Sequence, residues 1–426
     1  MSDLHDLCKF PVRPIDSGYV KQLNHYLTSG IPATYTVEEA YKVLNNIEDD
    51  DENSESVSNT TPLHLICQHV PKDLSSEELS IVEQMITTLF EYGAGWCFID
   101  VNNNTPGCIL IERGFHNSSL YQLILDAGVR AELLLRKVSE YDMEFIDEDD
   151  VPNQEDEVVP ELVTELTKEQ EEIEVVQKSN KPEIDDAPDA PSQNQDSYLN
   201  TKLEYVDNAL ITKDRKDGVM MSWESDLMKL GCDSLFKGSI IEENEIDSEI
   251  NILNIGFGMG IIDTMIQAEN PTKHYICEAH PDVLKKLRDD GWYEKSNVVI
   301  LEGRWQDQLD DLLTKGIFFN GIYYDTFSEH YSDMLDLFDF VVGLLKPYGI
   351  FSFFNGLGAD RQIIYEVYKK LVDIDLQNYG LSVTYTDVEV PKETLQYKDK
   401  SVWDDVKRSY WSCPVYYHPE AKFIEL

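Results

Sequence analysis

The sequence predicts an α/β protein in which a doubly wound, largely parallel sheet follows a smaller helical domain. From residue 251 onward, short β-rich runs alternate with helical patterns, and the first run ends in the glycine-rich stretch LNIGFGMG at 253–260. Such alternation is typical of a parallel sheet with helices on both faces. A weak helical repeat occupies the first 137 residues, and the length of 426 residues allows at least two cores.

The charge of the chain is strongly negative. Its 35 basic and 81 acidic residues give a formal net charge of −46. We therefore expect no direct nucleic-acid partner, because phosphate binding needs a positive surface. The charge favours a basic protein as partner, or it serves only solubility.

The seven cysteines form neither a CxxC pair nor a cluster with histidines at zinc spacing. We therefore predict a reducing compartment and no structural metal. The N-terminus, MSDLHDLCKF, lacks the apolar core of a signal peptide. No stretch approaches the ~18 apolar residues of a membrane span. We expect a cytoplasmic and nuclear monomer that does not enter membranes.

Residues 1–137 carry a weak repeat. LTSGI (27–31), FEYGA (90–94) and LDAGV (125–129) each place an apolar residue three before a glycine, which predicts helix ends with glycine at the C-cap. NTTPLHLIC (59–67) resembles the opening of an ankyrin repeat, and NNTPGCIL (103–110) is a degraded copy. We predict an ankyrin-like helical domain that binds further proteins; an unrelated helical domain is the alternative.

Residues 138–197 predict a disordered acidic linker. From Glu140 to Asp189 there are 20 acidic residues and 3 lysines, with several prolines. Such a segment cannot bury enough apolar surface to offset the entropy lost on ordering. Within it, residues 161–177 have the pattern of a short helix.

Residues 198–426 predict the α/β domain. The β-rich runs are NILNIGF, KHYICE, VVILE, FFNGIYYD and IFSFFN. Helices are predicted after them, from Met259, from Pro281, from about Trp305, over YSDMLDLFDFVVGLL, and from about Ala359. SVTYTDVEV and CPVYYH predict a closing antiparallel pair of strands.

The glycine loop after the first strand predicts a ligand close to the backbone. Gly256 permits the turn, Gly258 admits the ligand, and Gly260 lets the next helix pack closely. The spacing is G-x-G-x-G, and Ile261 stands where a dinucleotide motif has its third glycine. Because no lysine or arginine lies beside the loop, a nucleoside with a small charged tail fits better than a pyrophosphate. S-adenosylmethionine is such a ligand.

Three further positions predict parts of a site. Glu278 closes the second strand, where a carboxylate can hold ribose hydroxyls. Asp325 ends the fourth strand and suggests a cationic acceptor, although a helix cap or a supporting aspartate is the alternative. VMMSWESDLMKL (219–230) predicts a helix with Met220, Trp223, Glu224 and Met228 at helical intervals, a stripe that could equally be core.

Six stretches carry a family resemblance: MMSWESDLM, GFGMG, ICEAH, LEGRWQD, YYDTFSEHY and LLKPYGIFSFFN. In this order they resemble guanidinoacetate methyltransferase and, more fully, the fungal protein arginine N5-methyltransferase family, whose members add an N-terminal ankyrin-like region. The resemblance covers about 198–420 strongly and 1–137 loosely. KPYG at 346–349, where many relatives have KPGG, is a departure that should affect a turn more than the chemistry.

The resemblance implies a class I, seven-stranded, Rossmann-like methyltransferase that uses S-adenosyl-L-methionine. It places the cofactor contacts on Tyr198, Met220, Met228, Gly256, Phe257, Gly258, Met259, Gly260, Ile261, Ile262, Glu278, Ala279, His280, Trp305, Gln306 and Asp325. Tyr198 is the loosest match, since YLNTKLEY departs from the family pattern.

The acceptor implied by the resemblance is an arginine of a basic protein, with ribosomal proteins as the class. A guanidinium is a poor nucleophile until it loses a proton or its charge is localised. We predict that Asp325 and Glu224 grip the planar cation and that Asp325 assists proton loss. The paired-glutamate loop of the ω-nitrogen enzymes is not apparent, which favours the δ (N5) nitrogen.

Two alternatives stay open from the sequence. The acceptor could be a small guanidino compound, which leaves the first 190 residues without a role. The chain could also be a non-catalytic interaction protein with a vestigial nucleotide fold, although intact Gly256, Gly258, Glu278 and Asp325 argue against it.

Overall fold

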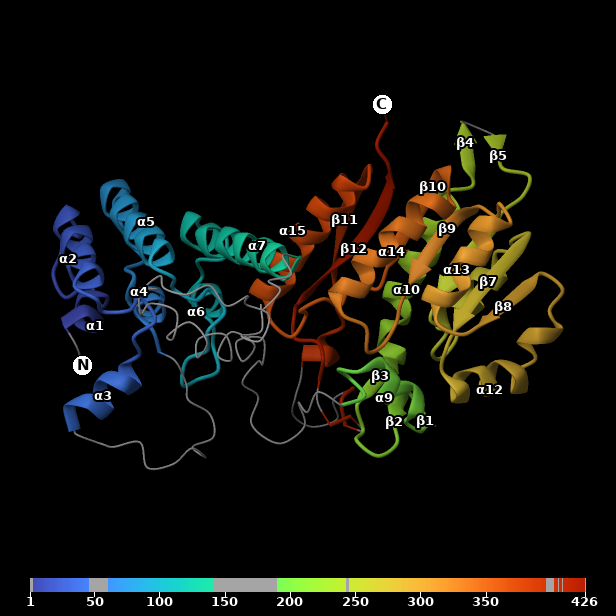
Figure 1. Cartoon of the computed structure of the whole chain (residues 1–426), viewed down its shortest axis with the longest axis horizontal. Helices are drawn as coiled ribbons and strands as arrows, with labels where there is room; N and C mark the ends of the chain where they lie inside the picture. Colours follow the sequence, from blue (N-terminus) through green and yellow to red (C-terminus); the bar gives the residue numbers. More distant parts are fainter. Residues whose placement is uncertain are drawn as a thin grey trace, which may run out of the picture. The chain divides into compact units, whose positions relative to one another are not determined.

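The computed structural model describes residues 3–45, 60–140, 190–242, 245–395, 402–404, 406–407 and 409–425. They belong to two compact units, Met1–Ile184 and Asp185–Leu426 (Figure 1). Most of the predicted linker, including the 161–177 helix, lies outside the described residues. Its described ends contain helical residues, since α7 continues to Glu140 and α9 begins at Gln195 after a turn at 191–193.

The first unit is helical in its described part. Its helices are α1 (Asp3–Leu7), α2 (Ser17–Thr28), α3 (Val37–Asn45), α4 (Pro62–His69), α5 (Ser76–Glu91), α6 (Pro106–Glu112) and α7 (Ser119–Glu140). Gly30 and Gly93 follow α2 and α5 with φ of 90° and 85°, which confirms two of the three predicted helix ends. The third is wrong: α7 continues through Gly128, because buried Ile124, Leu125 and Val129 extend its apolar stripe.

The two TP motifs both start helices. Thr61 precedes α4 and Thr105 precedes α6, and in each the proline occupies a first-turn position, where a missing N–H costs nothing. The His64 ring accepts the Thr61 N–H at Nδ1 (3.1 Å) and contacts the Phe98 carbonyl through Nε2 (2.9 Å). His64 thus ties one motif to a distant loop, while the ankyrin-like assignment stays a prediction.

The second unit is built on a seven-stranded sheet. In sheet order the strands are β11 (Leu381–Glu389), β12 (Val415–Phe423), β10 (Leu345–Phe353), β9 (Phe319–Tyr324), β6 (Asn251–Ile255), β7 (Lys273–Glu278) and β8 (Val298–Glu302). The pairs among β6–β10 are parallel, and β12 runs antiparallel to both neighbours. This is the class I methyltransferase, Rossmann-like topology, and the predicted antiparallel closing pair is confirmed.

Helices cover both faces of this sheet (Figure 1). Alternate strand residues face opposite cores: Ile252 and Tyr323 belong to one cluster, whereas Leu253 and Ile322 belong to the other. The first cluster includes side chains of α10 (Ser225–Lys237), α11 (Ile261–Ala268) and α12 (Pro281–Asp289). The second includes those of α13 (Trp305–Thr314), α14 (Tyr331–Leu344) and α15 (Gln362–Asn378). Period-two alternation therefore separates two buried layers.

A small antiparallel sheet corrects one prediction. Its strands are β1 (Leu203–Val206), β2 (Ala209–Thr212) and β3 (Gly218–Met221), and a two-stranded piece, β4 (Ile240–Glu242) with β5 (Glu245–Ile246), lies separately. The predicted helix over 219–230 is wrong in its first half: β3 and a 3₁₀ turn (Ser222–Glu224) precede α10. Met220 pairs with Leu210, so strand pairing overrides the local helical pattern.

Two helix starts also differ from expectation. α11 begins at Ile261 rather than Met259, because Gly258 and Gly260 adopt positive φ of 54° and 73°. α15 begins at Gln362 rather than near Ala359. The predicted starts at Pro281 and Trp305 are confirmed.

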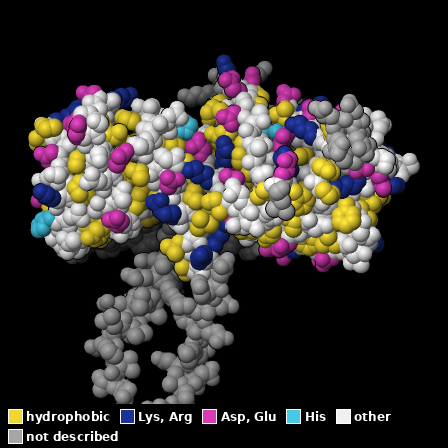
Figure 2. Space-filling view, turned by 90° about the horizontal axis from the view of Figure 1, so that it is seen from above, with side chains coloured by type: hydrophobic (Ala, Val, Ile, Leu, Met, Phe, Trp, Pro, Cys, Tyr) yellow, Lys and Arg dark blue, Asp and Glu magenta, His cyan; other side chains and the backbone are white. Residues whose placement is uncertain are grey.

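The described surface mixes both signs of charge. On the face shown in Figure 2, acidic and basic side chains are interspersed with apolar ones. Within the described ranges, no helix combines the length and apolar character needed to cross a membrane.

Candidate active site

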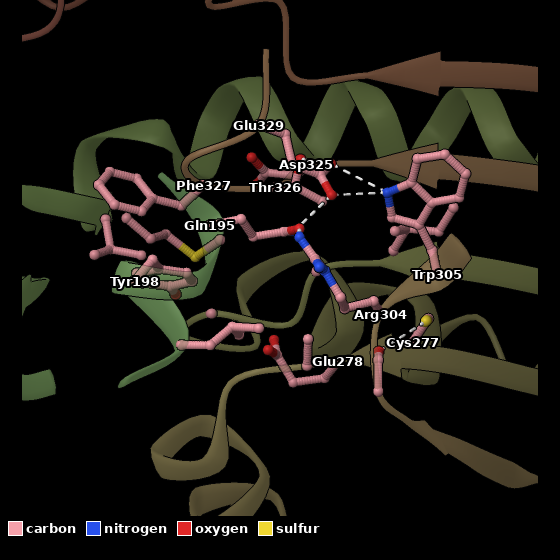
Figure 3. Close-up of a pocket in the computed structure, with 18 residues that line it drawn as sticks. Gln195, Tyr198, Cys277, Glu278, Arg304, Trp305, Asp325, Thr326, Phe327 and Glu329 are labelled. Carbon is pink, nitrogen blue, oxygen red and sulfur yellow. Dashed lines mark hydrogen bonds between the residues drawn. The ribbon is translucent and has the colours of Figure 1, made fainter. Parts of the chain in front are cut away.

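A pocket opens at the carboxyl ends of β6, β7 and β9 (Figure 3). It holds about 570 Å³ of empty volume, part of it open to solvent. Open α/β sheets place their ligands at this edge, where the strand order reverses. The lining residues are Gln195, Tyr198, Leu199, Val219, Met220, Ile255, Gly256, Gly258, Cys277, Glu278, Ala279, Gly303, Arg304, Trp305, Asp325, Thr326, Phe327 and Glu329.

The glycine turn forms the floor of the pocket. Gly256 has φ +94°, and a Cβ there would lie 1.9 Å from the Asp325 carbonyl oxygen. A Cβ on Gly258, with φ +54°, would lie 2.6 Å from the Met220 Cε. Met259 donates its N–H to the Met220 sulfur at 3.2 Å. A side chain at Gly256 would clash with backbone, whereas one at Gly258 would be strained by the positive φ and would displace the Met220 side chain, which reaches the turn from strand β3.

Glu278 is held at the end of β7 by the backbone. Its Oε2 accepts the Phe257 N–H (2.9 Å) and its Oε1 accepts the His280 N–H (2.7 Å). Burial raises the pKa of Glu278, and these backbone hydrogen bonds oppose that rise. Each carboxylate oxygen keeps a further lone pair, so Glu278 can still accept hydroxyl hydrogens from a ribose.

Tyr198, on α9 (Gln195–Asn200), forms one wall of the pocket. Its ring packs against His280 and Phe327, with centroids 4.7 and 4.9 Å away. The His280 ring also contacts the carbonyls of Tyr198 and Thr201, both at 3.1 Å. His280 therefore anchors α9 from behind rather than lining the pocket itself.

Asp325 has an unusual hydrogen-bonding state. Its Oδ2 atom is buried and has no hydrogen-bond partner among the described residues. Burial and the nearby charge of Asp263 raise the pKa of Asp325 to about 7. A buried polar atom without a partner is costly, so this carboxylate is suited to a ligand that supplies a positive N–H group.

Glu224 interacts electrostatically with Asp325, although the two belong to distant parts of the chain. Glu224 is 3% exposed; its Oε2 accepts the Met221 N–H (3.2 Å) and its Oε1 accepts the Tyr410 hydroxyl. Burial and the charge of Asp325 raise the pKa of Glu224 to about 8, against the effect of these two hydrogen bonds. The predicted pair of carboxylates is therefore close enough for electrostatic coupling.

The structure brings half of the predicted cofactor residues to the pocket. Tyr198, Met220, Gly256, Gly258, Glu278, Ala279, Trp305 and Asp325 line it. The others, which do not line it, are Met228, Phe257, Met259, Gly260, Ile261, Ile262, His280 and Gln306. The predicted catalytic residue Glu224 does not line it either.

The residues outside the lining have identifiable packing roles. Met228, Phe257 and Ile262 are buried in the core. For Met228 this is the core alternative given above for the stripe at 219–230. Gly260 caps α11, and the Gln306 amide donates to Glu329 (3.3 Å).

Several lining residues escaped the sequence-based prediction. Glu329 and Phe327 lie in YYDTFSEHY, and Arg304 lies in LEGRWQD, so both motifs contained the signal. Gln195 lies within the segment predicted as linker, so no site role was predicted for it.

Comparisons with known proteins identify the family of the chain. A sequence profile described as guanidinoacetate N-methyltransferase matches residues 217–411. Protein arginine N-methyltransferase 2 of Debaryomyces hansenii is 62% identical over 441 residues, covering 100% of both chains. That of Saccharomyces cerevisiae is 51% identical over 434 residues, covering 99% of this chain and 100% of the relative. The chain belongs to the protein arginine N-methyltransferase 2 family.

One of the matching solved structures is an O-methyltransferase of low sequence identity. The O-methyltransferase TomG from Streptomyces achromogenes, in complex with SAM, has a TM-score of 0.33 and 14% identity, covering 60% of this chain and 96% of that chain. The fold assignment rests on the strand order described above.

S-adenosyl-L-methionine, the methyl donor of this methyltransferase family, fits the residues present. When bound, it supplies a methyl group on a positively charged sulfur. Glu278 offers carboxylate oxygens for the ribose, and Trp305 offers an aromatic wall. The Asp325 Oδ2 atom, which has no partner among the described residues, is an acceptor available to a ligand in the same pocket.

Proposed function

We propose that this protein monomethylates the δ (N5) nitrogen of arginine residues in basic proteins, with S-adenosylmethionine as donor. The observation that carries the proposal is the pairing of two carboxylates: Glu224 is buried and its pKa is raised in part by the charge of Asp325, and Asp325 is half-buried with an Oδ2 that has no partner among the described residues. Two like charges with little access to water are unfavourable alone and become favourable around a cation.

The proposed acceptor geometry follows from the two carboxylates. A guanidinium presents five N–H donors in a plane. One carboxylate can therefore accept hydrogen bonds from the two terminal nitrogens, and the other can accept from the internal nitrogen. Glu224, held by Met221 and Tyr410, is the fixed partner for the terminal nitrogens. Asp325, with its free Oδ2, is the partner for the internal nitrogen.

Asp325 has a pKa suited to proton transfer. Its raised value of about 7 makes it a stronger base than an ordinary aspartate at neutral pH. Asp325 would hold the internal N–H and take its proton as the nitrogen bonds to the methyl carbon of the donor; the bond from that carbon to sulfur would break, with its electron pair left on a neutral thioether. The Oδ2 atom of Asp325 is buried, and low exposure to water strengthens the attraction of a carboxylate for a cation. Alignment of acceptor and donor supplies much of the remaining acceleration.

The substrate class that we propose is a basic protein, with ribosomal proteins as the first candidates. The net charge of −46 favours approach of a cationic partner. Methylation of a small guanidino compound would leave the helical unit before residue 140 without a role. The presence of this unit therefore supports a macromolecular acceptor or partner.

The test is incubation of the full chain with methyl-labelled S-adenosylmethionine and a ribosomal protein fraction, followed by complete hydrolysis and amino-acid analysis. We expect label in protein, as δ-N-methylarginine. Label in ω-N-methylarginine would overturn the nitrogen assignment. Label in a small guanidino compound but not in protein would overturn the substrate class.

A further inference from the structure

Glu329 has the densest set of hydrogen bonds around the pocket, and no role in methyl transfer has been given to it above. Its Oε1 accepts from Gln195 Nε2 (2.7 Å), Trp305 Nε1 (2.9 Å) and Gln306 Nε2 (3.3 Å). Its Oε2 accepts from the Thr326 hydroxyl (2.7 Å), from Trp305 Nε1 (3.1 Å) and from the Tyr324 hydroxyl. Five donor groups therefore converge on one carboxylate.

These donors come from three separate segments. Gln195 lies on α9, Trp305 and Gln306 lie in the first turn of α13, and Tyr324 and Thr326 flank the end of β9. In Figure 3 the labelled side chains of Gln195, Trp305 and Glu329 converge at one side of the pocket. Glu329 thus joins three parts of the wall that the backbone alone does not link.

The hydrogen bonds favour a carboxylate at position 329. The Trp305 indole and the Gln195 and Gln306 amides direct N–H groups at it, and an N–H group can only donate. The Tyr324 and Thr326 hydroxyls also donate here. A glutamine accepts with one oxygen only, so its NH₂ group would replace an acceptor that some of these donors use.

The backbone before Glu329 is strained. Ser328 has φ of 68°, in the left-handed region that residues other than glycine rarely adopt. Such strain persists only where surrounding contacts hold it. Here it directs the Glu329 side chain into the five donors.

Gln195 extends the network to the only cation that lines the pocket in the described chain. It donates to Glu329 and accepts from the Arg304 guanidinium, which also contacts Asp196 at 3.4 Å. α9 is thus fastened to the pocket at Gln195, while Tyr198 on the same helix forms the wall.

We propose that Glu329 is the positioning residue of the cofactor pocket: it fixes the plane of the Trp305 indole and fastens α9 so that both can enclose S-adenosylmethionine. Trp305 is 3% exposed and lines the pocket, so a small rotation of its ring changes the space left for the ligand. The inference concerns the cofactor pocket and does not depend on which nitrogen accepts the methyl group.

The test is calorimetric titration of the full chain with S-adenosylmethionine, without acceptor, for Glu329→Gln. We expect Kd to rise about tenfold to a hundredfold, as for one or two lost hydrogen bonds to a charged group. Glu302→Gln is the matched control, because Glu302 also accepts two side-chain hydrogen bonds, from Arg288 and Tyr293, but lies outside the lining. We expect Glu302→Gln to bind S-adenosylmethionine with the Kd of the wild type.

A double-mutant cycle separates positioning from general stability. Trp305→Phe keeps a ring and removes the indole donor. If Glu329 acts through Trp305, Glu329→Gln will weaken binding less in the Trp305→Phe background than in the wild type. The proposal would be overturned if the two substitutions raised Kd independently, so that their fold-changes multiplied in the double variant. It would also be overturned if Glu329→Gln lowered only the melting temperature and left Kd unchanged.

Glu329→Asp serves as the second variant. It keeps the charge but shortens the reach, so we expect a folded protein with a Kd between those of wild type and Glu329→Gln. Failure of both variants to fold, as judged by circular dichroism, would mean that Glu329 is a general structural residue and would also overturn the proposal.

Discussion

Carboxylates on the two sides of the active site differ in how far the protein satisfies them. On the cofactor side, Glu278 and Glu329 accept hydrogen bonds on both oxygens. On the acceptor side, Glu224 also accepts on both oxygens, but Asp325 has a buried oxygen without a partner in the described chain. The pKa of Asp325 is raised to about 7 and that of Glu224 to about 8. The same chemical group therefore serves as a rigid support on one side and as an unsatisfied acceptor on the other.

This contrast has a physical reason. A carboxylate whose hydrogen bonds are satisfied by the protein keeps its geometry whether or not a ligand is present. An unsatisfied one costs stability in the empty site and recovers that cost when a cation arrives. The acceptor side should therefore be sensitive to pH and to loss of charge, and the cofactor side to loss of individual hydrogen bonds.

The largest effect is expected for Asp325→Asn. Removing the group that takes the proton should lower methyl transfer by about a hundredfold to ten-thousandfold at saturating S-adenosylmethionine. Radiolabel transfer to the protein substrate measures it. Near-wild-type transfer would rule out the proposed role of Asp325.

The same variant should be more stable than the wild type at pH 8. Because the folded pKa of Asp325 is about 7 and the ordinary value is 3.8, the wild type loses stability as the pH rises between these values. The gain for asparagine should be on the order of a few kcal/mol at pH 8 and should shrink toward pH 4. Thermal melts at both pH values measure the difference, and equal stabilities at pH 8 would show that the charge is not buried.

The next effect is the pH dependence of the wild type. Acceptor binding needs both carboxylates ionised, and their pKa values are about 7 and about 8. The kcat/KM for the acceptor should therefore fall with acidity below pH 8, by up to about tenfold per pH unit for each group. Binding of S-adenosylmethionine should change far less over this range. A flat acceptor profile between pH 6 and 8 would contradict the raised values.

A smaller effect is expected on the cofactor side for Glu278→Gln. The amide can accept only one of the two N–H groups of Phe257 and His280, so Kd for S-adenosylmethionine should rise about tenfold. The acid limb of the acceptor profile should stay in place, because Glu278 is not among the groups that shift Asp325 or Glu224. A shift of this acid limb along the pH axis would mean that the cofactor side and the acceptor side of the site are not independent.

The smallest effect is expected for Tyr410→Phe. The hydroxyl of Tyr410 lowers the pKa of Glu224 by hydrogen bonding, so its loss should raise that pKa further. The acid limb should move to higher pH, with a loss of about threefold to tenfold at pH 7.5, the size expected for one hydrogen bond, and little loss at pH 9. Initial rates across this range measure it; a loss independent of pH would point to packing of the aromatic ring instead.

Much of the α/β domain followed from local patterns. Period-two and helical runs predicted the strand and helix succession, and the positions of Gly256, Glu278 and Asp325 at strand ends predicted one edge of the sheet as the site. Parallel strands bring their carboxyl ends together, so residues at those ends need no further information to be placed near one another.

Other features depended on contacts between distant segments. Residues 218–221 form a strand because β2 pairs with them, against their helical spacing. Gln195 meets Glu329 across 134 positions, and Tyr410 meets Glu224 across 186. The raised pKa of each acceptor carboxylate and the five-donor support at Glu329 arise from burial and from such long-range pairs. A residue's type and neighbours in the chain specify what it can bind, but its solvation and its partners exist only after the separate segments have packed together.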